Sequence, residues 1–157
     1  MDKPKKIIGR AENVDFPALG LFKVPARVDT GARTSTIWAS QIQIDENGTL
    51  SFCLFDESSP YFTNHTISTK SYSKIVVASS MGTIQKRYKI RLFIKLKGKK
   101  IHASFTLADR SQQAFPILIG RNILKGKFVV DVKKTKKTLK QHEKSRINSL
   151  QEMLEEV

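Results

Sequence analysis

The chain has 157 residues and a formal net charge of +14, a length that suits one domain with its own hydrophobic core. Its single cysteine, Cys53, excludes an internal disulfide and is expected to be a buried thiol. The basic N-terminus is not followed by the apolar core of a signal peptide, and no apolar run could span a membrane. We therefore expect a cytoplasmic protein with no membrane partner.

The first half of the chain consists of short apolar or alternating runs separated by turn residues, which is the pattern of an all-β protein. Residues 45–48, Asp-Glu-Asn-Gly, form a strong hairpin signal between two of these runs. The expected strands are residues 5–9, 22–28, 37–44, 50–55, 61–69 and 74–78.

Residues 86–100, called the basic ribbon below, carry eight basic side chains and no acid. Apolar side chains from Tyr88 to Leu96 share one face of a strand, and basic side chains share the other, where only Phe93 interrupts them. A turn at Lys97 to Lys100 and a second alternating run at 101–107 complete a two-stranded ribbon. Its charged face is either a solvated surface or a contact for RNA, the ribosome or an acidic peptide.

The last part of the chain predicts a change from strand to helix. One helical turn is expected at 122–124 and a closing strand at 127–132. A lysine-rich connector then leads to a predicted amphipathic helix over 144–157, where apolar residues recur at helical spacing. The predicted architecture is a closed or partly open β-barrel domain over residues 1–132, followed by a basic connector and helical tail over 133–157.

Two short motifs carry the chemistry. The triplet Asp29-Thr30-Gly31 directly follows a strand-like run, and Gly120-Arg121-Asn122 directly follows another. An Asp-Thr-Gly triplet by itself is also ordinary turn chemistry, because Asp can cap its own backbone and Gly permits a tight turn. In this order within one β-rich chain, the two motifs resemble the halves of a retropepsin-type aspartic peptidase site.

The resemblance extends to a bacterial retropepsin-like aspartic peptidase family over roughly residues 5–131. This family has often been labelled an ATP-dependent zinc protease, and its members occur beside, or fused to, ATP-grasp glutamate ligases that modify a ribosomal protein. The resemblance implies a retropepsin-like acid protease fold. The matching segments are residues 7–10, 28–35, 79–82, 106–111 and 115–121.

Three positions depart from the family pattern. Trp38 stands where many relatives have histidine, Gln85 where an acid is common, and Gln113 where methionine is common. The first two changes remove candidate zinc ligands, and the three histidines of the chain are widely spaced with no His-Glu-x-x-His motif. With no glycine-rich phosphate loop either, we expect neither a metal nor a cofactor.

The resemblance makes Asp29 the catalytic residue. Aspartic peptidases need two carboxyl groups that share one proton. This chain has one Asp-Thr-Gly, and the other candidates, Asp109 and Asp131, lack the following Thr-Gly. The implied enzyme is therefore a homodimeric endopeptidase in which Asp29 of each subunit activates water.

The neighbouring residues receive roles from the same resemblance. The Thr30 hydroxyl would join the two loops across the dimer axis, Gly31 would permit the tight turn, and Ala32 would leave room for a substrate side chain. Residues Gly120, Arg121 and Asn122 would pack behind the loop, with Arg121 bonded to backbone carbonyls.

Other roles remain open. The turn at 79–83 is expected to act as a flap that places Met81 or Gly82 over the substrate. Arg33 either binds an acidic group of the substrate or anchors the loop, and Trp38 is expected in the core. Family association suggests a glutamate-rich peptide substrate. The alternative function is a non-catalytic module of the same fold that uses the basic ribbon to bind RNA, the ribosome or acidic peptides.

Overall fold

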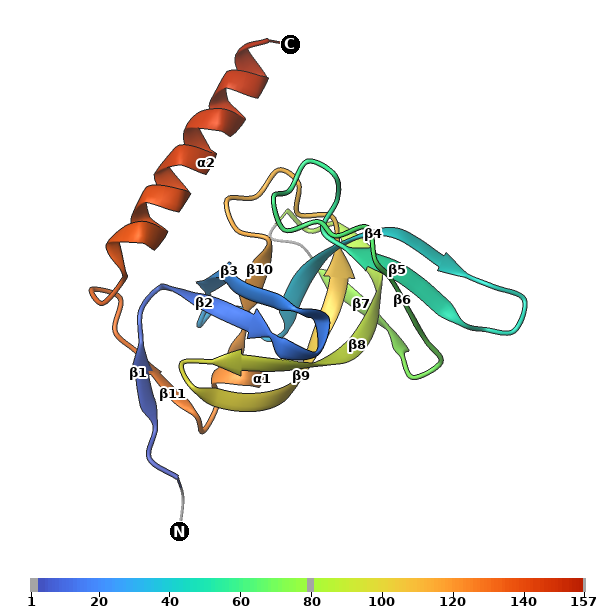
Figure 1. The fold of residues 1–157 in the computed structure, drawn as a ribbon, viewed down its shortest axis with the longest axis horizontal. Coiled ribbons are helices and arrows are strands. Elements are labelled where there is room, and N and C mark those ends of the chain that lie inside the picture. The colour runs from blue at the N-terminus through green and yellow to red at the C-terminus, as the bar shows by residue number, and fades with distance from the viewer. Residues whose placement is uncertain (1–2, 79–80, 157) are drawn as a thin grey trace.

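The computed structural model describes residues 3–78 and 81–156, which form a small β-barrel with a long C-terminal helix (Figure 1). The elements in chain order are β1 (Lys6–Ile8), β2 (Ala11–Phe16), a 3-10 turn (Pro17–Leu19), β3 (Leu21–Val28), β4 (Ser35–Ile44), β5 (Leu50–Leu54), β6 (Thr66–Thr69), β7 (Ser73–Ala78), β8 (Ile84–Leu96), β9 (Lys99–Ala108), β10 (Ile117–Ile119), α1 (Arg121–Leu124), β11 (Phe128–Val130) and α2 (Lys137–Glu155).

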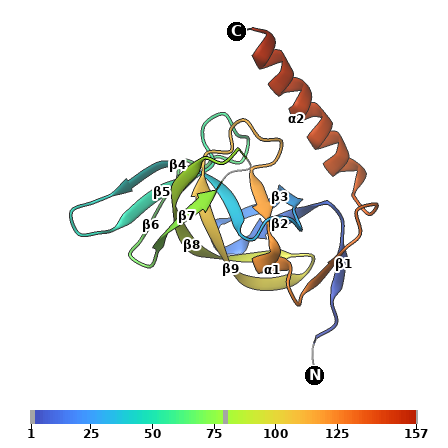
Figure 2. The ribbon, with the colours of Figure 1, turned by 180° about the vertical axis from the view of Figure 1, so that it is seen from behind.

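Six strands close into the barrel, which confirms the predicted all-β barrel and shows that it is closed. Neighbouring strands follow the order β10, β3, β2, β8, β9 and β4, and β4 pairs back with β10. The interior is filled by alternate side chains of these strands, among them Phe16, Ile37, Phe105 and Ile117, each without exposed surface. The β4–β5 hairpin and α2 project from opposite sides of the barrel (Figures 1 and 2).

Strand β10 has only three residues, but it decides the geometry of the site. It runs parallel to β3, with Ile119 opposite Val28, and antiparallel to β4, with Leu118 opposite Thr36. The short strand therefore lies between the two strands that lead into and out of residues 29–34. The Gly120 motif is brought against the Asp29 motif by this pairing.

The predicted basic ribbon is confirmed as the hairpin of β8 and β9. Ile90 and Ile94 point into the core, while Arg91, Phe93 and Lys95 are exposed. The two strands are joined by Lys97 and Gly98, both with positive φ, which is the backbone of a tight two-residue hairpin. Strand β7 pairs with the first half of β8 to form a second hairpin.

Strand β2 was not expected from the sequence. Its polar residues hide the alternation, yet Glu12 is buried because its Oε1 accepts the backbone N–H of Gly9 at 3.1 Å. The buried side chains of Val14 and Phe16 supply the inward face of this strand. In an ordinary barrel strand an apolar side chain would occupy the inward position that the buried, hydrogen-bonded Glu12 has here. The sequence of this strand therefore lacks the usual apolar alternation.

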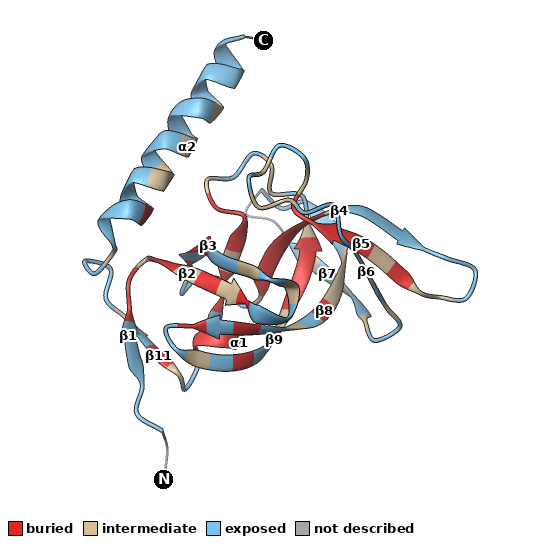
Figure 3. Cartoon of the chain, in the orientation of Figure 1, coloured by how far each residue is buried: buried red, intermediate tan, exposed pale blue. Residues whose placement is uncertain are grey.

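Helix α2 is confirmed, but it begins at Lys137, seven residues earlier than the predicted start at Lys144. Its first half docks through polar contacts. His142 Nε2 donates to the carbonyl of Ala114 at 2.9 Å, and Glu143 pairs with Arg10 at 2.8 Å. Only Leu139 is buried, and the second half of the helix is largely exposed (Figure 3). The predicted last residue of the helix, Val157, lies outside the described residues.

Candidate active site

Backbone hydrogen bonds hold the Asp29 loop, residues 29–34, in place. The N–H of Asp29 donates to the carbonyl of Ile119 at 2.9 Å, which continues the β3–β10 pairing by one residue. The N–H of Ala32 donates to the Asp29 carbonyl at 3.3 Å and closes a turn. The catalytic candidate is therefore positioned by a barrel strand rather than by a free loop.

The Asp29 carboxylate turns back on its own loop. Its Oδ1 accepts the N–H of Gly31 at 2.9 Å, and the residue is half-buried. A Cβ atom at position 31 would lie 3.2 Å from this oxygen, so the absence of a side chain there leaves room for the hydrogen bond. This contact orients one oxygen and leaves the other available to a water molecule or a second carboxyl group.

Gly120 lies directly behind the loop. A Cβ atom added to it would stand 2.3 Å from the carbonyl oxygen of Thr34 and 2.9 Å from that of Ala32. Only glycine permits this approach. Arg121 then grips the same loop: its N–H donates to the Ala32 carbonyl at 2.8 Å, and its Nη1 donates to the carbonyls of Thr30 and Gly31 at 3.2 and 3.1 Å.

A hydroxyl network ties these two segments to the barrel. The Ser35 hydroxyl accepts the Gly120 N–H at 2.9 Å and donates to Asn122 Oδ1 at 2.7 Å. The Asn122 amide in turn donates to the carbonyl of Ser104 on β9 at 3.0 Å. Ser35 is fully buried, and this role was not predicted from the sequence, where the only signal for it is the position of Ser35 at the end of the block 28–35 that resembles the family.

Three arginines that were not predicted from the sequence, Arg27, Arg87 and Arg110, form a cluster of like charge centred on Arg110. The pKa of Arg110 is lowered to about 10, mainly by burial and then by the charges of Arg87 and Arg27, while Asp29 acts in the opposite direction. Burial also lowers the pKa of Arg87. Arg27 lies on β3, Arg87 on β8 and Arg110 after β9, and Arg110 is the member of the cluster that interacts with Asp29.

Gln85 accepts from the Arg87 guanidinium at 3.1 and 3.3 Å. Many members of the family that this chain resembles have an acid at position 85. Because Gln85 is neutral, its contact holds the Arg87 side chain without neutralising the charge of the guanidinium group. Arg110 is held by a bond from its Nε to the carbonyl of Phe115 at 2.9 Å. Neither arginine forms an ion pair within residues 3–78 and 81–156.

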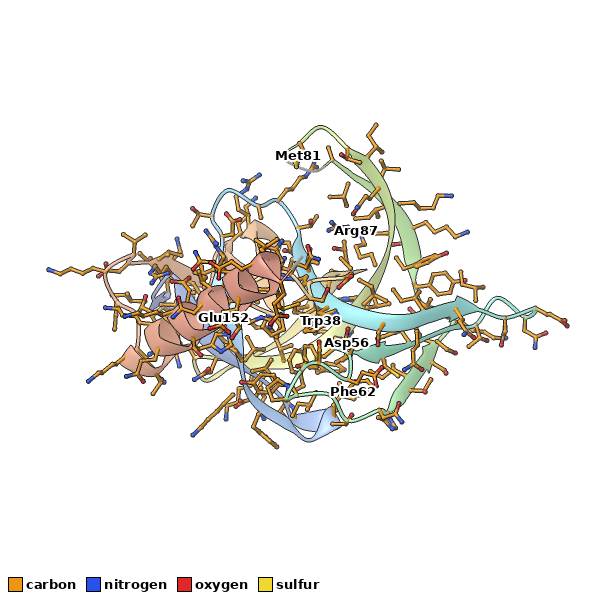
Figure 4. The ribbon with its side chains drawn as sticks, turned by 90° about the horizontal axis from the view of Figure 1, so that it is seen from above. Trp38, Asp56, Phe62, Met81, Arg87 and Glu152 are labelled. Atoms are coloured by element: carbon orange, nitrogen blue, oxygen red, sulfur yellow. The ribbon has the colours of Figure 1, made fainter. Side chains whose placement is uncertain are left out.

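The remaining predicted site residues lie on the rim. Ala32 is half-buried, whereas Thr30 and Arg33 are exposed. Met81, 90% exposed, and Gly82 stand at the tip of the β7–β8 hairpin, with Arg87 further along β8 (Figure 4). Ser79 and Ser80, the start of the predicted flap, lie outside the described residues.

The two other candidates for a catalytic acid each accept a hydrogen bond from their own turn. Asp109 Oδ1 accepts the Ser111 N–H at 2.8 Å, and Asp131 Oδ1 accepts the Lys133 N–H at 3.0 Å. Trp38 is in the core beside Phe55, as expected, and Cys53 is a buried free thiol.

No cluster of three or more metal-ligating side chains occurs within residues 3–78 and 81–156. Over the same part of the chain, no helix combines the length and the apolar character needed to cross a membrane.

Comparison with known proteins identifies the family. A family model described as retropepsin-like aspartic endopeptidase RimB matches residues 7–141. The chain belongs to this RimB-like family. The matched range contains the Asp29 loop, the β7–β8 and β8–β9 hairpins, β10 and the start of α2. Every element of the candidate site therefore falls within it.

The curated relatives of this chain are named as ligases and not as peptidases. Proteins called probable alpha-L-glutamate ligase from Shewanella halifaxensis and Desulfotalea psychrophila are 36% and 32% identical over 135 and 133 residues, or 83% of this chain. The chain spans only 29% of the length of either relative.

A solved structure of a protein of unknown function from Legionella pneumophila is similar in fold. Its TM-score is 0.66 at 24% identity, and the match covers 86% of this chain and 99% of that one.

Proposed function

We propose that this member of the RimB-like family is an aspartic endopeptidase that acts as a cytoplasmic homodimer, with one Asp29 from each subunit at the catalytic centre. The observation that carries the proposal is the Asp29 loop itself. Its carboxylate is oriented by the Gly31 N–H, and its backbone is held by Ile119 and Arg121. A preorganised carboxylate of this kind is what general acid–base chemistry requires.

The reaction needs two such carboxyl groups a few ångströms apart. Two like charges at that distance cannot both ionise cheaply, so one group keeps a proton and the other stays ionised. The ionised Asp29 removes a proton from water, and the neutral Asp29 donates its proton to the carbonyl oxygen of the peptide bond. Since Asp109 and Asp131 each cap their own turns, the second carboxyl group is assigned to the partner subunit.

The arginine cluster around Arg110 favours an acidic substrate. Arg87 and Arg27 each repel Arg110, which also interacts with Asp29, and a carboxylate side chain of a bound peptide would relieve that repulsion. Arg33 is exposed next to the same loop and is able to add a further contact. Relatives named as glutamate ligases support a glutamate-rich peptide as the substrate, with Ala32 leaving room beside the cleaved bond and Met81 and Gly82 covering it.

The test compares cleavage of two labelled peptides, one with a central run of glutamate and one with glutamine in the same positions. The wild-type protein should cleave the glutamate peptide. Asp29→Asn should reduce the rate by about 10³-fold or more, because the amide cannot act as the base. The amide oxygen still accepts the Gly31 N–H, so the variant should fold normally.

Asp131→Asn is the matched control, because Asp131 also accepts a backbone N–H two residues ahead but lies outside the site. It should cleave like the wild type. Sedimentation should detect a dimer for all three proteins. Undiminished cleavage by Asp29→Asn, or full activity of a monomer, would exclude this mechanism.

The second candidate is a binding module without turnover, favoured by the exposed cations of the basic ribbon. This candidate predicts that the wild-type protein binds acidic peptides or RNA with an affinity that falls as salt rises. It also predicts that the protein hydrolyses neither the glutamate peptide nor the glutamine peptide.

A further inference from the structure

The outer face of the β8–β9 hairpin presents a stacked aromatic pair to solvent. The rings of Phe93 and His102 lie opposite each other across the two strands, with centroids 4.0 Å apart and planes within 8°. Phe93 is 64% exposed, and His102 is also exposed. One ring face of the pair is therefore held flat and open by a rigid hairpin, which is the geometry of a platform for another planar group.

Cations surround this platform. Arg91 and Lys95 flank Phe93 on the same face of β8, and Lys100 lies beside His102 on β9. Lys95 and Lys100 stand directly opposite each other, an arrangement of like charges that destabilises a sheet. We call these residues, together with Ser104 opposite Arg91, the Phe93 face.

None of these cations forms an ion pair within residues 3–78 and 81–156, where the pair of Arg10 and Glu143 is the only one. One acid stands near them, because Asp15 lies opposite Lys95 across the β2–β8 pairing, and its Oδ1 accepts the Lys23 N–H. Every charged side chain between positions 58 and 108 of the sequence is basic. An excess of cations beside an exposed ring points to an anionic ligand with flat groups.

A polar hollow of about 320 Å³ adjoins the platform and lies within the usual size range of small-ligand sites. It shares Arg91 and His102 with the Phe93 face and adds the cations of Lys89 and Lys127. A second hollow of about 340 Å³ continues from it along β8 and shares Lys89, Arg91 and Ser104. The linings of both contain hydroxyl groups and no acid, which suits a ribose–phosphate backbone.

We propose that the Phe93 face binds single-stranded RNA. An unpaired base stacks on the Phe93 ring, the phosphates on either side contact Arg91, Lys95 and Lys100, and the adjoining hollow receives the next sugar and phosphate. An acidic peptide would use the cations but has no planar base for the ring. This inference deepens the second candidate function described above and does not rest on the peptidase chemistry of Asp29.

The experiment measures fluorescence anisotropy of a labelled 12-nucleotide oligouridine with the full-length chain over a range of salt concentrations. Phe93→Ala should weaken binding by about 5- to 100-fold, the usual cost of losing one stacked base. Phe93→Trp should keep wild-type affinity. Phe22→Ala is the matched control, because Phe22 is 59% exposed on β3, which β2 separates from β8, and it should bind like the wild type.

The charge contribution is measured separately with Lys95→Glu/Lys100→Glu, which should weaken binding and lower the slope of log affinity against log salt by about 1–2. Lys140→Glu/Lys144→Glu on α2 changes the net charge equally and should leave the slope near that of the wild type. Since Phe93 and both lysine pairs are exposed, all variants should be folded at the temperature of the binding measurement, which circular dichroism checks.

Three results would overturn the proposal: no binding of the wild type at 0.1 M salt, equal binding by Phe93→Ala, or equal affinity for a duplex of the same length. If the protein bound an oligoglutamate peptide more tightly than the RNA, and Phe93→Ala did not change that affinity, the face would instead be assigned to acidic peptides. Asp29→Asn should bind RNA as the wild type does, so a failure here and a failure of the peptidase proposal are told apart.

Discussion

The Asp29 loop and the tip of the β7–β8 hairpin differ in what holds them. Backbone groups of the loop are engaged by β10, by Arg121 and by the turn of the loop itself. The hairpin is held by pairing between its own two strands, and large apolar side chains such as Val76, Met81 and Ile84 are 68–90% exposed at or near its end. The barrel therefore fixes Asp29, the proposed catalytic residue, whereas the segment proposed to cover the substrate has few contacts beyond its own strand pairing.

The strongest test of this contrast compares two glycines. Gly120→Ala forces a Cβ atom against the Thr34 carbonyl, and because both partners are backbone, we expect a loss of about 3 kcal/mol in unfolding free energy. Gly82→Ala at the hairpin tip meets no atom within 4 Å and should cost about 1 kcal/mol, from its positive φ alone. Urea unfolding of both variants gives the comparison, and equal losses would contradict it.

A smaller effect is expected when the hydroxyl network is cut. Ser35→Ala leaves the buried Gly120 N–H and the Asn122 amide oxygen without their partner, so stability should fall by about 2 kcal/mol. Ser51→Ala removes an exposed hydroxyl that pairs only with Ser68, and should change stability by less than about 0.5 kcal/mol. Thermal unfolding measures both, and a neutral Ser35→Ala would show that the loop is held without this network.

The smallest change in stability should come from the hairpin tip. Met81→Ala should leave unfolding within about 0.5 kcal/mol of the wild type, since the side chain is 90% exposed. If the tip covers the substrate, KM for the glutamate peptide should rise several-fold. Met153→Ala, an exposed methionine of α2, is the control and should alter neither quantity. An unchanged KM for Met81→Ala would remove the flap from the proposal.

Much of the barrel followed from the sequence because alternation and turn residues are local signals. The β8–β9 hairpin was predicted with its inward and outward faces, and Asp45 indeed caps the β4–β5 turn through the N–H groups of Asn47 and Thr49. The Asp29 and Gly120 motifs were recognisable for the same reason, since each directly follows an apolar strand.

The parts that escaped prediction depend on partners distant in the chain. Arg27 and Arg87 act on Arg110 only because the fold brings β3 and β8 close to the segment after β9. The early start of α2 follows from contacts such as Arg10 with Glu143, which join residues 133 positions apart and leave no apolar periodicity. Hydropathy patterns report burial of apolar side chains, so polar docking of this kind is invisible to them.

The insertion of β10 between β3 and β4 has a consequence for biosynthesis. Asp29 leaves the ribosome early, but the strand that positions it is made some ninety residues later. Such non-local pairing is slow to form because a long loop must close first. A nascent or truncated chain without β10 therefore lacks the strand that positions Asp29, so the Asp29 loop becomes organised only when nearly the whole barrel has been synthesised.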